Sequence, residues 1–413
     1  MDRIEPAPTL LRGIGSNIAA HRRAAGVTQT DLAGRIGRSV QWVSAVEQGR
    51  RHADRLSDLL HIAAAVGCQV EDLIGRPVDT LAPGTRPRAQ DVDAVRAVVL
   101  RSPMPALVGV PDQLPALEDV DARVSDAWRT WHGSSHAHST LGAQLPQLLT
   151  DAMTVHHTAP DRRAGARVLA GAWQITRQWL HHIPDGELAW IAADRAMTAA
   201  READDPHLIA LGAWALSASY RRAGQQDEAT RLCLAAADEL RPRLDDSRPD
   251  TDLLAAYGML HLAAAISAAQ SDEDTRAWAL HNVANGAARA LGDRYHPWTM
   301  FGHGNVDIHG LAVNAELGRA DDVVELSRRL NIDSVPSVER RTRVLIDTAR
   351  GHVQRGEDEA AILVLLDAEE VSTDEVRDSG LVHELLRELL HRDRARARKH
   401  VQALARRIGL IAA

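Results

Sequence analysis

Residues 27–51 read VTQTDLAGRIGRSVQWVSAVEQGRR, and this stretch predicts two short helices joined by a tight turn. Thr28 and Ser39 are suited to cap these helices, because a hydroxyl oxygen accepts a hydrogen bond from an amide in the first turn. Gly37 lies between them, where the left-handed conformation that ends a helix costs glycine least. The first helix gathers its apolar residues on one face, namely Leu32, Ala33 and Ile36.

The second helix, expected at residues 39–48, has two different edges. Val43 and Val46 face inward. The outward residues are small or carry an amide, namely Val40, Gln41, Ser44 and Ala45. Gly49 ends this helix, and two arginines follow it. The stretch therefore predicts a helix whose outer edge faces solvent.

The order Thr-Gln-x-x-Leu-Ala-x-x-Ile-Gly, then Ser-x-x-x-Val-Ser-x-x-Glu-x-Gly-Arg, resembles the helix-turn-helix of the Cro/repressor-like (XRE-type) DNA-binding domain. The resemblance extends from a helix near residues 14–25 to the closing segment ADRLSDLLHIAAAVGCQVEDLI at residues 53–74. It implies a five-helix, lambda-repressor-like domain, which we place at residues 1–75 and call the head.

The resemblance also implies how the head contacts DNA. The second helix enters the major groove with its N-terminal part against base edges. Gln41 is the best candidate for base readout, since a carboxamide pairs bidentately with adenine, and Val40 and Ala45 suit a thymine methyl group. Phosphate contacts, which position the domain without reading sequence, fall to four residues. These are Gln29, Ser39, Arg50 and Arg51.

Trp42 departs from the family pattern, in which this position is small or polar. We include it with Ser44 among the residues near DNA, with two roles open: packing on the sugar-phosphate backbone or packing on a neighbouring helix. Arg22 and Glu47 correspond to the internal ion pair that links the first and third helices of the family. Such a pair is better understood as fixing geometry than as adding net stability.

The whole chain of 413 residues is long enough for two or more domains, and its composition is that of a soluble globular protein. We see no run of about 18 uncharged apolar residues, so we expect no membrane span. The start, MDRIEPAPTL, has no apolar core of signal-peptide length, so we expect a cytoplasmic protein. Two distant cysteines, Cys68 and Cys233, suggest neither a disulfide scaffold nor a zinc site.

The net charge of −8 is unevenly distributed. Residues 11–76 carry nine arginines against six acidic residues, whereas residues 77–413 carry 38 basic against 48 acidic residues. Because phosphate attraction supplies most non-specific affinity, a head with a net charge of +3 binds DNA weakly alone. We therefore expect a homodimer whose two heads act together on a double-stranded operator with paired half-sites.

Two proline-rich stretches separate the head from the remainder. Residues 76–90, RPVDTLAPGTRPRAQ, and residues 102–115 have no apolar period, and DVDAVRAVVL at residues 91–100 between them reads as one short helix. We assign residues 76–118 as a linker and residues 119–413 as the body. The body shows no run of alternating β-branched residues, so the predicted fold class is all-α.

The segment LGAWALSASYRRAGQQDEATRLCLAAADELRP, from Leu211, is similar to a tetratricopeptide repeat. Its small, aromatic and turn residues fall close to the positions of that repeat, namely Ser217, Tyr220, Gly224, Ala229 and Ala236. Comparable turns occur near residues 184–186, 271–272, 318 and 356. The body is therefore predicted to be a divergent tetratricopeptide-like, right-handed helical solenoid with a concave surface.

Residues 292–310, GDRYHPWTMFGHGNVDIHG, are the most unusual segment of the body. The combination of this head, this body and the FGxxNVxxH order resembles a group of bacterial cytoplasmic regulators, which implies that the body senses an effector. Our candidate effector-binding residues are Trp298, Phe301, Asn305 and His309. The tryptophans of the body either lock repeats together or line an aromatic cavity.

Other chemistry finds less support. His303, Asp307 and His309 are either a partial metal site or polar residues at a helix start, and we assign no metal and no cofactor. Residues 156–157 and residues 181–182 are two pairs of adjacent histidines. Adjacent side chains point to different faces of a helix, so we do not expect either pair to share a binding site. We find no Gly-rich phosphate loop, GxSxG, CxxC or HExxH, so we do not expect an enzyme.

These observations together predict a sequence-specific DNA-binding transcriptional regulator. Its operator binding is expected to respond to a small molecule, peptide or protein on the body, through a shift between conformations. One alternative is an interaction scaffold whose solenoid docks a protein partner while DNA binding is secondary or lost. A second alternative is an enzyme with its site hidden in the solenoid.

Overall fold

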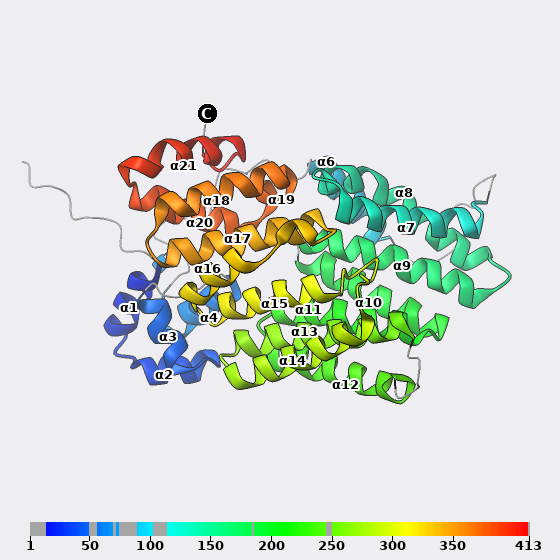
Figure 1. The fold of residues 1–413 in the computed structure, drawn as a ribbon, viewed down its shortest axis with the longest axis horizontal. Helices are drawn as coiled ribbons and strands as arrows, with labels where there is room; N and C mark the ends of the chain where they lie inside the picture. Colours follow the sequence, from blue (N-terminus) through cyan, green and yellow to red (C-terminus); the bar gives the residue numbers. More distant parts are fainter. Residues whose placement is uncertain are drawn as a thin grey trace, which may run out of the picture.

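The computed structural model describes residues 14–48, 56–68, 72–73, 89–101, 114–183, 186–244 and 250–411. Every regular element in these ranges is a helix and none is a strand, so the prediction of an all-α protein is confirmed (Figure 1). The helices of the head are α1 (Ile14–Ala24), α2 (Gln29–Ile36), α3 (Val40–Glu47) and α4 (Leu56–Val66). A fifth head helix would fall largely on residues outside the described ranges.

The helix boundaries in the head follow from local chemistry. The Thr28 side chain accepts a hydrogen bond from the Asp31 amide, and the Asp31 carboxylate accepts one from the Thr28 amide, which completes a capping box at the start of α2. Gly37 ends α2 in the left-handed conformation, with φ of 66°. Ser39 then caps α3 by accepting a hydrogen bond of 3.0 Å from the Trp42 amide. A small apolar core under the helices, including Leu32 and Ile62, holds the head together.

The body is a succession of helices in which chain neighbours pack side by side (Figure 1). The short helix expected in the linker is α6 (Ala89–Val99), and its valines belong to the same apolar core as the first helices of the body. The others are α7 (Leu117–Gly133), α8 (Ala137–Thr158), α9 (Arg162–His181), α10 (Gly186–Ala203), α11 (Pro206–Arg222), α12 (Gln226–Leu244), α13 (Thr251–Gln270), α14 (Asp274–Leu291), α15 (His303–Glu316), α16 (Ala320–Arg329), α17 (Val338–Gln354), α18 (Asp358–Val371), α19 (Thr373–Asp378), α20 (Gly380–Arg392) and α21 (Ala395–Arg407), with the 3-10 helix η3 (Ile332–Ser334).

Tight turns join successive helices at four of the five places where the sequence predicted them, and the fifth, near residues 184–186, lies partly outside the described residues. Gly224, Gly318 and Gly356 each have a φ between 72° and 77° and lie between α11 and α12, α15 and α16, and α17 and α18. Asp272 takes the same left-handed conformation, with φ of 66°, between α13 and α14. A left-handed residue at such a turn lets the chain reverse directly, so consecutive helices form antiparallel pairs.

The helix α13 forms much of the centre of the body. It is the one helix among the described residues that is long and apolar enough to cross a membrane by length and composition, yet 83% of that window is buried inside the protein. The Phe301 ring packs directly on Gly258 of α13, where an added Cβ would lie 1.9 Å from the ring. The segment before α15 is therefore tightly fitted to the central helix.

Two long-range arrangements position the sites described below. The head lies against the end of the body where α13 turns into α14, with α2 and α3 beside that turn (Figure 1). The C-terminal helices return toward the first helices of the body, so that α19 contacts α8 and α17 contacts α7.

Candidate nucleic-acid interface

The helix α3 presents the two edges that its sequence predicts. Val43 and Val46 are buried in the head core, at 1% and 2% exposure. On the opposite edge Val40 is 41% exposed and Gln41 is also exposed, while Ser44 and Ala45 are half-buried. This outer edge is free of the head's own core and can approach another surface.

Trp42 occupies the inner edge of α3. Its side chain is 3% exposed within the apolar core of the head. The Arg38 guanidinium lies 5.2 Å from the centre of its ring. Of the two roles that the sequence left open for Trp42, the structure therefore supports packing on the neighbouring helices of the head. Trp42 is therefore removed from the set of residues that could touch DNA in this conformation.

Behind α3, an ion pair joins its C-terminal end to α1. Arg22 Nε and Nη2 donate to the two carboxylate oxygens of Glu47 over 2.5 and 2.9 Å. Gln29 Nε2 donates to the same carboxylate over 2.8 Å. Burial alone would raise the pKa of Glu47, but the hydrogen bonds from Arg22 and Gln29 outweigh it and lower the pKa. Gln29, expected on a phosphate, thus has one amide hydrogen committed within the head.

At the other end of α3, the body contacts the turn of the helix-turn-helix. The Ser39 hydroxyl, which caps α3, donates a hydrogen bond to the Asp272 carboxylate between α13 and α14. Arg38 donates to the carbonyl of Gln270 and, over 2.9 Å, to the Asp58 carboxylate. Gln41 stays exposed beside this contact. The acidic body therefore touches the N-terminal corner of α3 and leaves its outer edge uncovered.

The Asp272 carboxylate lies at the N-terminus of α3, a position that favours negative charge. The N-terminus of a helix attracts anions, because its first amides are unpaired and the helix dipole is positive there. Ser39 is one of the residues expected to contact a phosphate, and Asp272 brings a carboxylate to it. The body thus places a carboxylate at the residue where the sequence predicts a phosphate contact. Arg50 and Arg51 lie outside the described residues.

The four candidate effector residues lie mainly inside the body. Phe301 and Asn305 are fully buried, and His309 is 7% exposed. Burial lowers the pKa of His309 to about 3, so that its ring is neutral. Trp298 is half-buried and stacks on Trp128, with ring centres 5.5 Å apart. In this conformation the side chains pack on one another, and their effector role stays a prediction.

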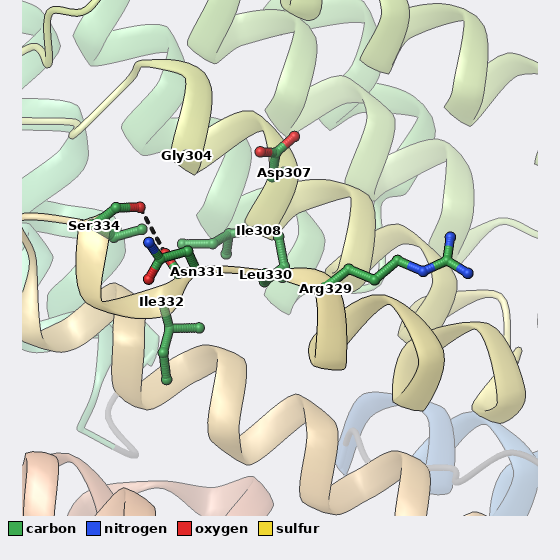
Figure 2. A pocket seen from close by; sticks show the side chains of 9 residues that line it. Gly304, Asp307, Ile308, Arg329, Leu330, Asn331, Ile332 and Ser334 are labelled. Atoms are coloured by element: carbon green, nitrogen blue, oxygen red, sulfur yellow. Dashed lines mark hydrogen bonds between the residues drawn. The ribbon is translucent and has the colours of Figure 1, made fainter.

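A pocket lies beside α15, on the side of the helix that carries Gly304 and Asp307 (Figure 2). Its volume is about 250 Å³, and residues of α15 and of the segment 329–335 line it, among them Gly304, Asp307, Ile308 and Asn331. Asp307 and His303 are exposed, whereas His309 is buried on the other face. The structure therefore does not bring together the three residues considered as a partial metal site.

Buried polar groups of the body had no visible signal in the sequence. Arg177 is 2% exposed, and its Nε and Nη2 have no hydrogen-bond partner. Its guanidinium lies 4.5 Å from the centre of the Trp214 ring. Burial, with Arg221 and Arg340 nearby, lowers its pKa to about 9. The amide atoms of Gln174, one turn earlier on α9, also lack partners.

Comparison with known proteins agrees with the geometry of the head. The helix-turn-helix domain family matches residues 14–73. The chain is 38% identical over 73 residues to the "Uncharacterized HTH-type transcriptional regulator y4dJ" of Sinorhizobium fredii, a match that covers 18% of this chain and 92% of that protein.

Over the longer range, the chain is similar to a solved structure of a mutant of PrgX. This match covers 88% of this chain and 95% of that one, with 11% sequence identity and a TM-score of 0.28. The domain match and the regulator from Sinorhizobium fredii identify the head. The chain therefore belongs to the helix-turn-helix family of transcriptional regulators.

Proposed function

We propose that this protein is a sequence-specific DNA-binding regulator in which α3 is the recognition helix. The observation that carries the proposal is the exposed edge of α3, where Gln41 and Val40 face away from the head core. Ala45 and Ser44 continue this edge toward the C-terminal end of the helix. An edge of this composition suits the major groove, because a carboxamide reads adenine and small apolar groups accommodate thymine methyl groups.

Rigid support from behind favours this role for α3. The bond set among Arg22, Gln29 and Glu47 fixes the helix relative to α1 and α2. Precise base readout needs such a fixed helix, because a small tilt would break bidentate hydrogen bonds. Ser39, Arg50 and Arg51 would contact phosphates and set the register of the head on the duplex.

The contact between Ser39 and Asp272 supports a closed state of the regulator. While Asp272 accepts the Ser39 hydrogen bond, a phosphate cannot take that place, and the acidic body stands close to the path of the duplex. Release of the contact would open the N-terminal corner of α3. An effector that binds the open arrangement more tightly would then raise operator affinity by shifting the population toward it.

The body supplies the sensing part of this proposal. Antiparallel helix pairs with turns at Gly224, Gly318 and Gly356 are consistent with a tetratricopeptide-like right-handed solenoid. We place the effector near Trp298, Phe301, Asn305 and His309. The buried guanidinium of Arg177, two of whose nitrogens lack partners, favours an effector that carries a carboxylate or phosphate. Two such chains would bind paired half-sites as a homodimer.

The direct experiment is a fluorescence anisotropy titration of the full chain with labelled duplex from upstream of its own gene. We expect the upstream duplex to bind more tightly than a shuffled duplex of the same composition. The logarithm of the binding constant should fall linearly with the logarithm of the salt concentration. A salt-independent or sequence-independent signal, together with capture of a stoichiometric protein partner, would instead support the interaction scaffold.

A further inference from the structure

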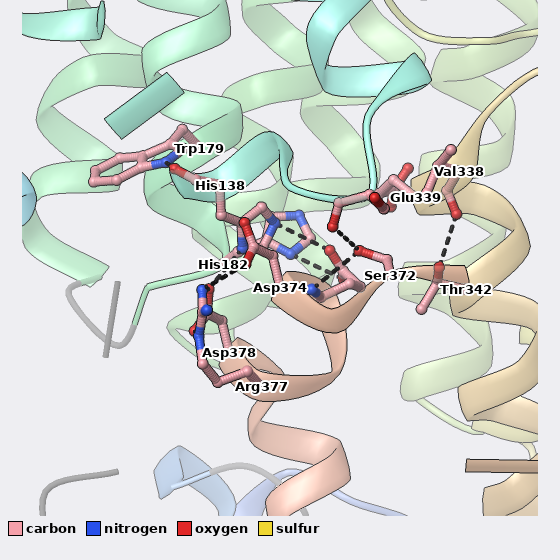
Figure 3. A network of polar contacts seen from close by, with 12 residues as sticks. His138, Trp179, His182, Val338, Glu339, Thr342, Ser372, Asp374, Arg377 and Asp378 are labelled. Carbon is pink, nitrogen blue, oxygen red and sulfur yellow. Dashed lines mark hydrogen bonds and ion pairs between the residues drawn. The ribbon is translucent and has the colours of Figure 1, made fainter. Parts of the chain in front are cut away.

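Three segments far apart in the sequence bring ionisable side chains together inside the body (Figure 3). His138 lies at the start of α8, and His182 follows the end of α9. The short helix α19 supplies Asp374, Glu375 and Asp378. All but His182 have nearly fully buried side chains, and His182 keeps 14% of its side chain exposed. The cluster is therefore largely enclosed, and His182 is its most exposed member.

Glu375 stands between the two imidazole rings. Its Oε2 lies 3.1 Å from His138 Nε2, and its Oε1 lies 3.2 Å from His182 Nδ1. One ligand atom from each of the three residues lies within 4.8 Å of the others. Zinc bonds of about 2.0–2.2 Å would place such atoms roughly 3.5 Å apart, so a small closing movement suffices.

The His138 ring is held in the orientation that a metal ligand needs. Asp378 Oδ2 lies 2.9 Å from its Nδ1, which directs Nε2 toward Glu375. Trp131 stacks on the ring at 5.2 Å between centres, and the indole of Trp179 donates to the His138 carbonyl over 2.8 Å. A carboxylate on the far nitrogen of a histidine is the usual support of a metal-binding imidazole.

The carboxylates of the cluster need compensating positive charge, because they are buried. Three carboxylates stand together on α19, those of Asp374, Glu375 and Asp378. The Arg377 guanidinium pairs with Asp374 and Asp378, each over 2.9 Å, and supplies one positive charge. Burial opposes the charged form of His138, but the carboxylates of Asp378 and Glu375 outweigh it and raise the pKa of His138 to about 10. A protonated His138 therefore compensates one further charge when no metal is bound, and a divalent cation would take the place of that proton. An experiment can separate these two cases.

We propose that His138, His182 and Glu375 bind a divalent transition metal ion, with zinc as the best fit to the ligand set. Two imidazoles and one carboxylate suit zinc, and a water molecule would complete the four ligands, whereas calcium and magnesium prefer oxygen ligands. The ion would join the first helices of the body to α19, and hence to α20 and α21, which follow. Metal loading would then determine how firmly the C-terminal helices are held.

The test uses full-length protein that has been treated with a chelator, dialysed and titrated with Co²⁺. We expect about one Co²⁺ per chain, with visible absorption bands of a low-coordinate nitrogen and oxygen site that Zn²⁺ removes. His182→Ala and Glu375→Gln should each weaken Co²⁺ binding at least tenfold. Asp378→Asn, which leaves all three ligands in place, should weaken it by about 10–100-fold.

The matched control is His156→Ala, because His156 also pairs with a carboxylate, that of Glu202 over 2.7 Å, at a different place on α8. This variant should bind Co²⁺ as the unchanged protein does, and Zn²⁺ should raise the melting temperature of both. The proposal is overturned if the unchanged chain binds no more Co²⁺ than His182→Ala. Equal losses in the control and in the ligand variants would overturn it as well. Neither result bears on DNA binding.

Discussion

The Ser39 hydroxyl donates a hydrogen bond to the Asp272 carboxylate across 233 residues of sequence. The same hydroxyl oxygen accepts the amide of Trp42 and so caps α3. Helix α3, the proposed recognition helix, and the body therefore share the Ser39 hydroxyl, so a movement of Asp272 would act directly on the N-terminal cap of α3. This shared contact gives the proposed regulation a specific and removable element.

Replacing Asp272 with asparagine should raise operator affinity. Asparagine tolerates the left-handed backbone at this turn, but it removes the carboxylate that competes with phosphate. A hydrogen bond to a charged group contributes about 1.5 kcal/mol or more, so we expect roughly tenfold tighter binding in anisotropy titrations. Asp252→Asn, an exposed position at the other end of α13, is the control and should leave affinity unchanged. Equal affinities for Asp272→Asn and the unchanged chain would argue against the closed state.

Arg50→Ala should act differently from changes on the outer edge of α3. A phosphate contact carries no base information, so binding to all sequences should weaken alike. The slope of the logarithm of affinity against the logarithm of salt should decrease in size by about 0.9 for the lost contact. Titration of one operator and one shuffled duplex at several salt concentrations measures both effects. A loss confined to the operator would place Arg50 at a base instead.

The buried pair behind α3 predicts a stability effect. Glu47→Gln leaves the Arg22 charge without its counter-ion and should destabilise the head by about 3 kcal/mol or more. Amide hydrogen exchange in α1–α3 is the appropriate measurement, because it reports on the head separately from the body. Glu325→Gln removes a half-exposed ion pair on α16 and should change exchange little. Similar exchange in the two variants would contradict the structural role of Glu47.

Acid should destabilise the body through its buried neutral histidines. Burial lowers the pKa values of His132, His296 and His309 to about 3, against a usual value of 6.5. As the pH falls below 6.5 the unfolded chain binds protons that the folded chain does not, so stability is lost between about pH 6.5 and 3. Each histidine should remove about 2 kcal/mol by pH 5.

Urea unfolding at pH 7.5 and pH 5 measures this loss. The informative variant is His132→Gln, whose amide can still donate to the Trp298 carbonyl that His132 Nε2 contacts over 3.1 Å. Its stability should fall less between the two pH values than that of the unchanged chain. If both lose the same free energy, His132 does not contribute as the structure indicates.

Sequence alone predicted the features that local chemistry determines. The caps at Thr28 and Ser39, the stop at Gly37 and the turn at Gly224 each depend on residues within a few positions. The all-α class and the exposed edge at Gln41 follow from apolar periodicity, which is also local. Trp42 departs from the family pattern, so the sequence leaves its two roles open, and only the packed helices of the head place it in the core.

The remaining features depend on contacts between distant parts of the chain. Nothing near Ser39 indicates that Asp272 meets it, and nothing near His138 indicates Glu375, because α19 reaches α8 only after the chain has turned many times. The buried guanidinium of Arg177 is likewise visible only once the packed helices exclude water from it. Periodicity separates buried from exposed faces, but it does not tell which faces meet.

Selection of binding sites from a random DNA pool, with the full chain and with Gln41→Ala, tests whether the outer edge of α3 reads bases. We expect the unchanged chain to enrich a motif with paired half-sites, and Gln41→Ala to lose preference at one base position in each half-site, worth about 1–3 kcal/mol. Failure to enrich any motif, or an identical motif with Gln41→Ala, would contradict the claim that the outer edge of α3 reads DNA.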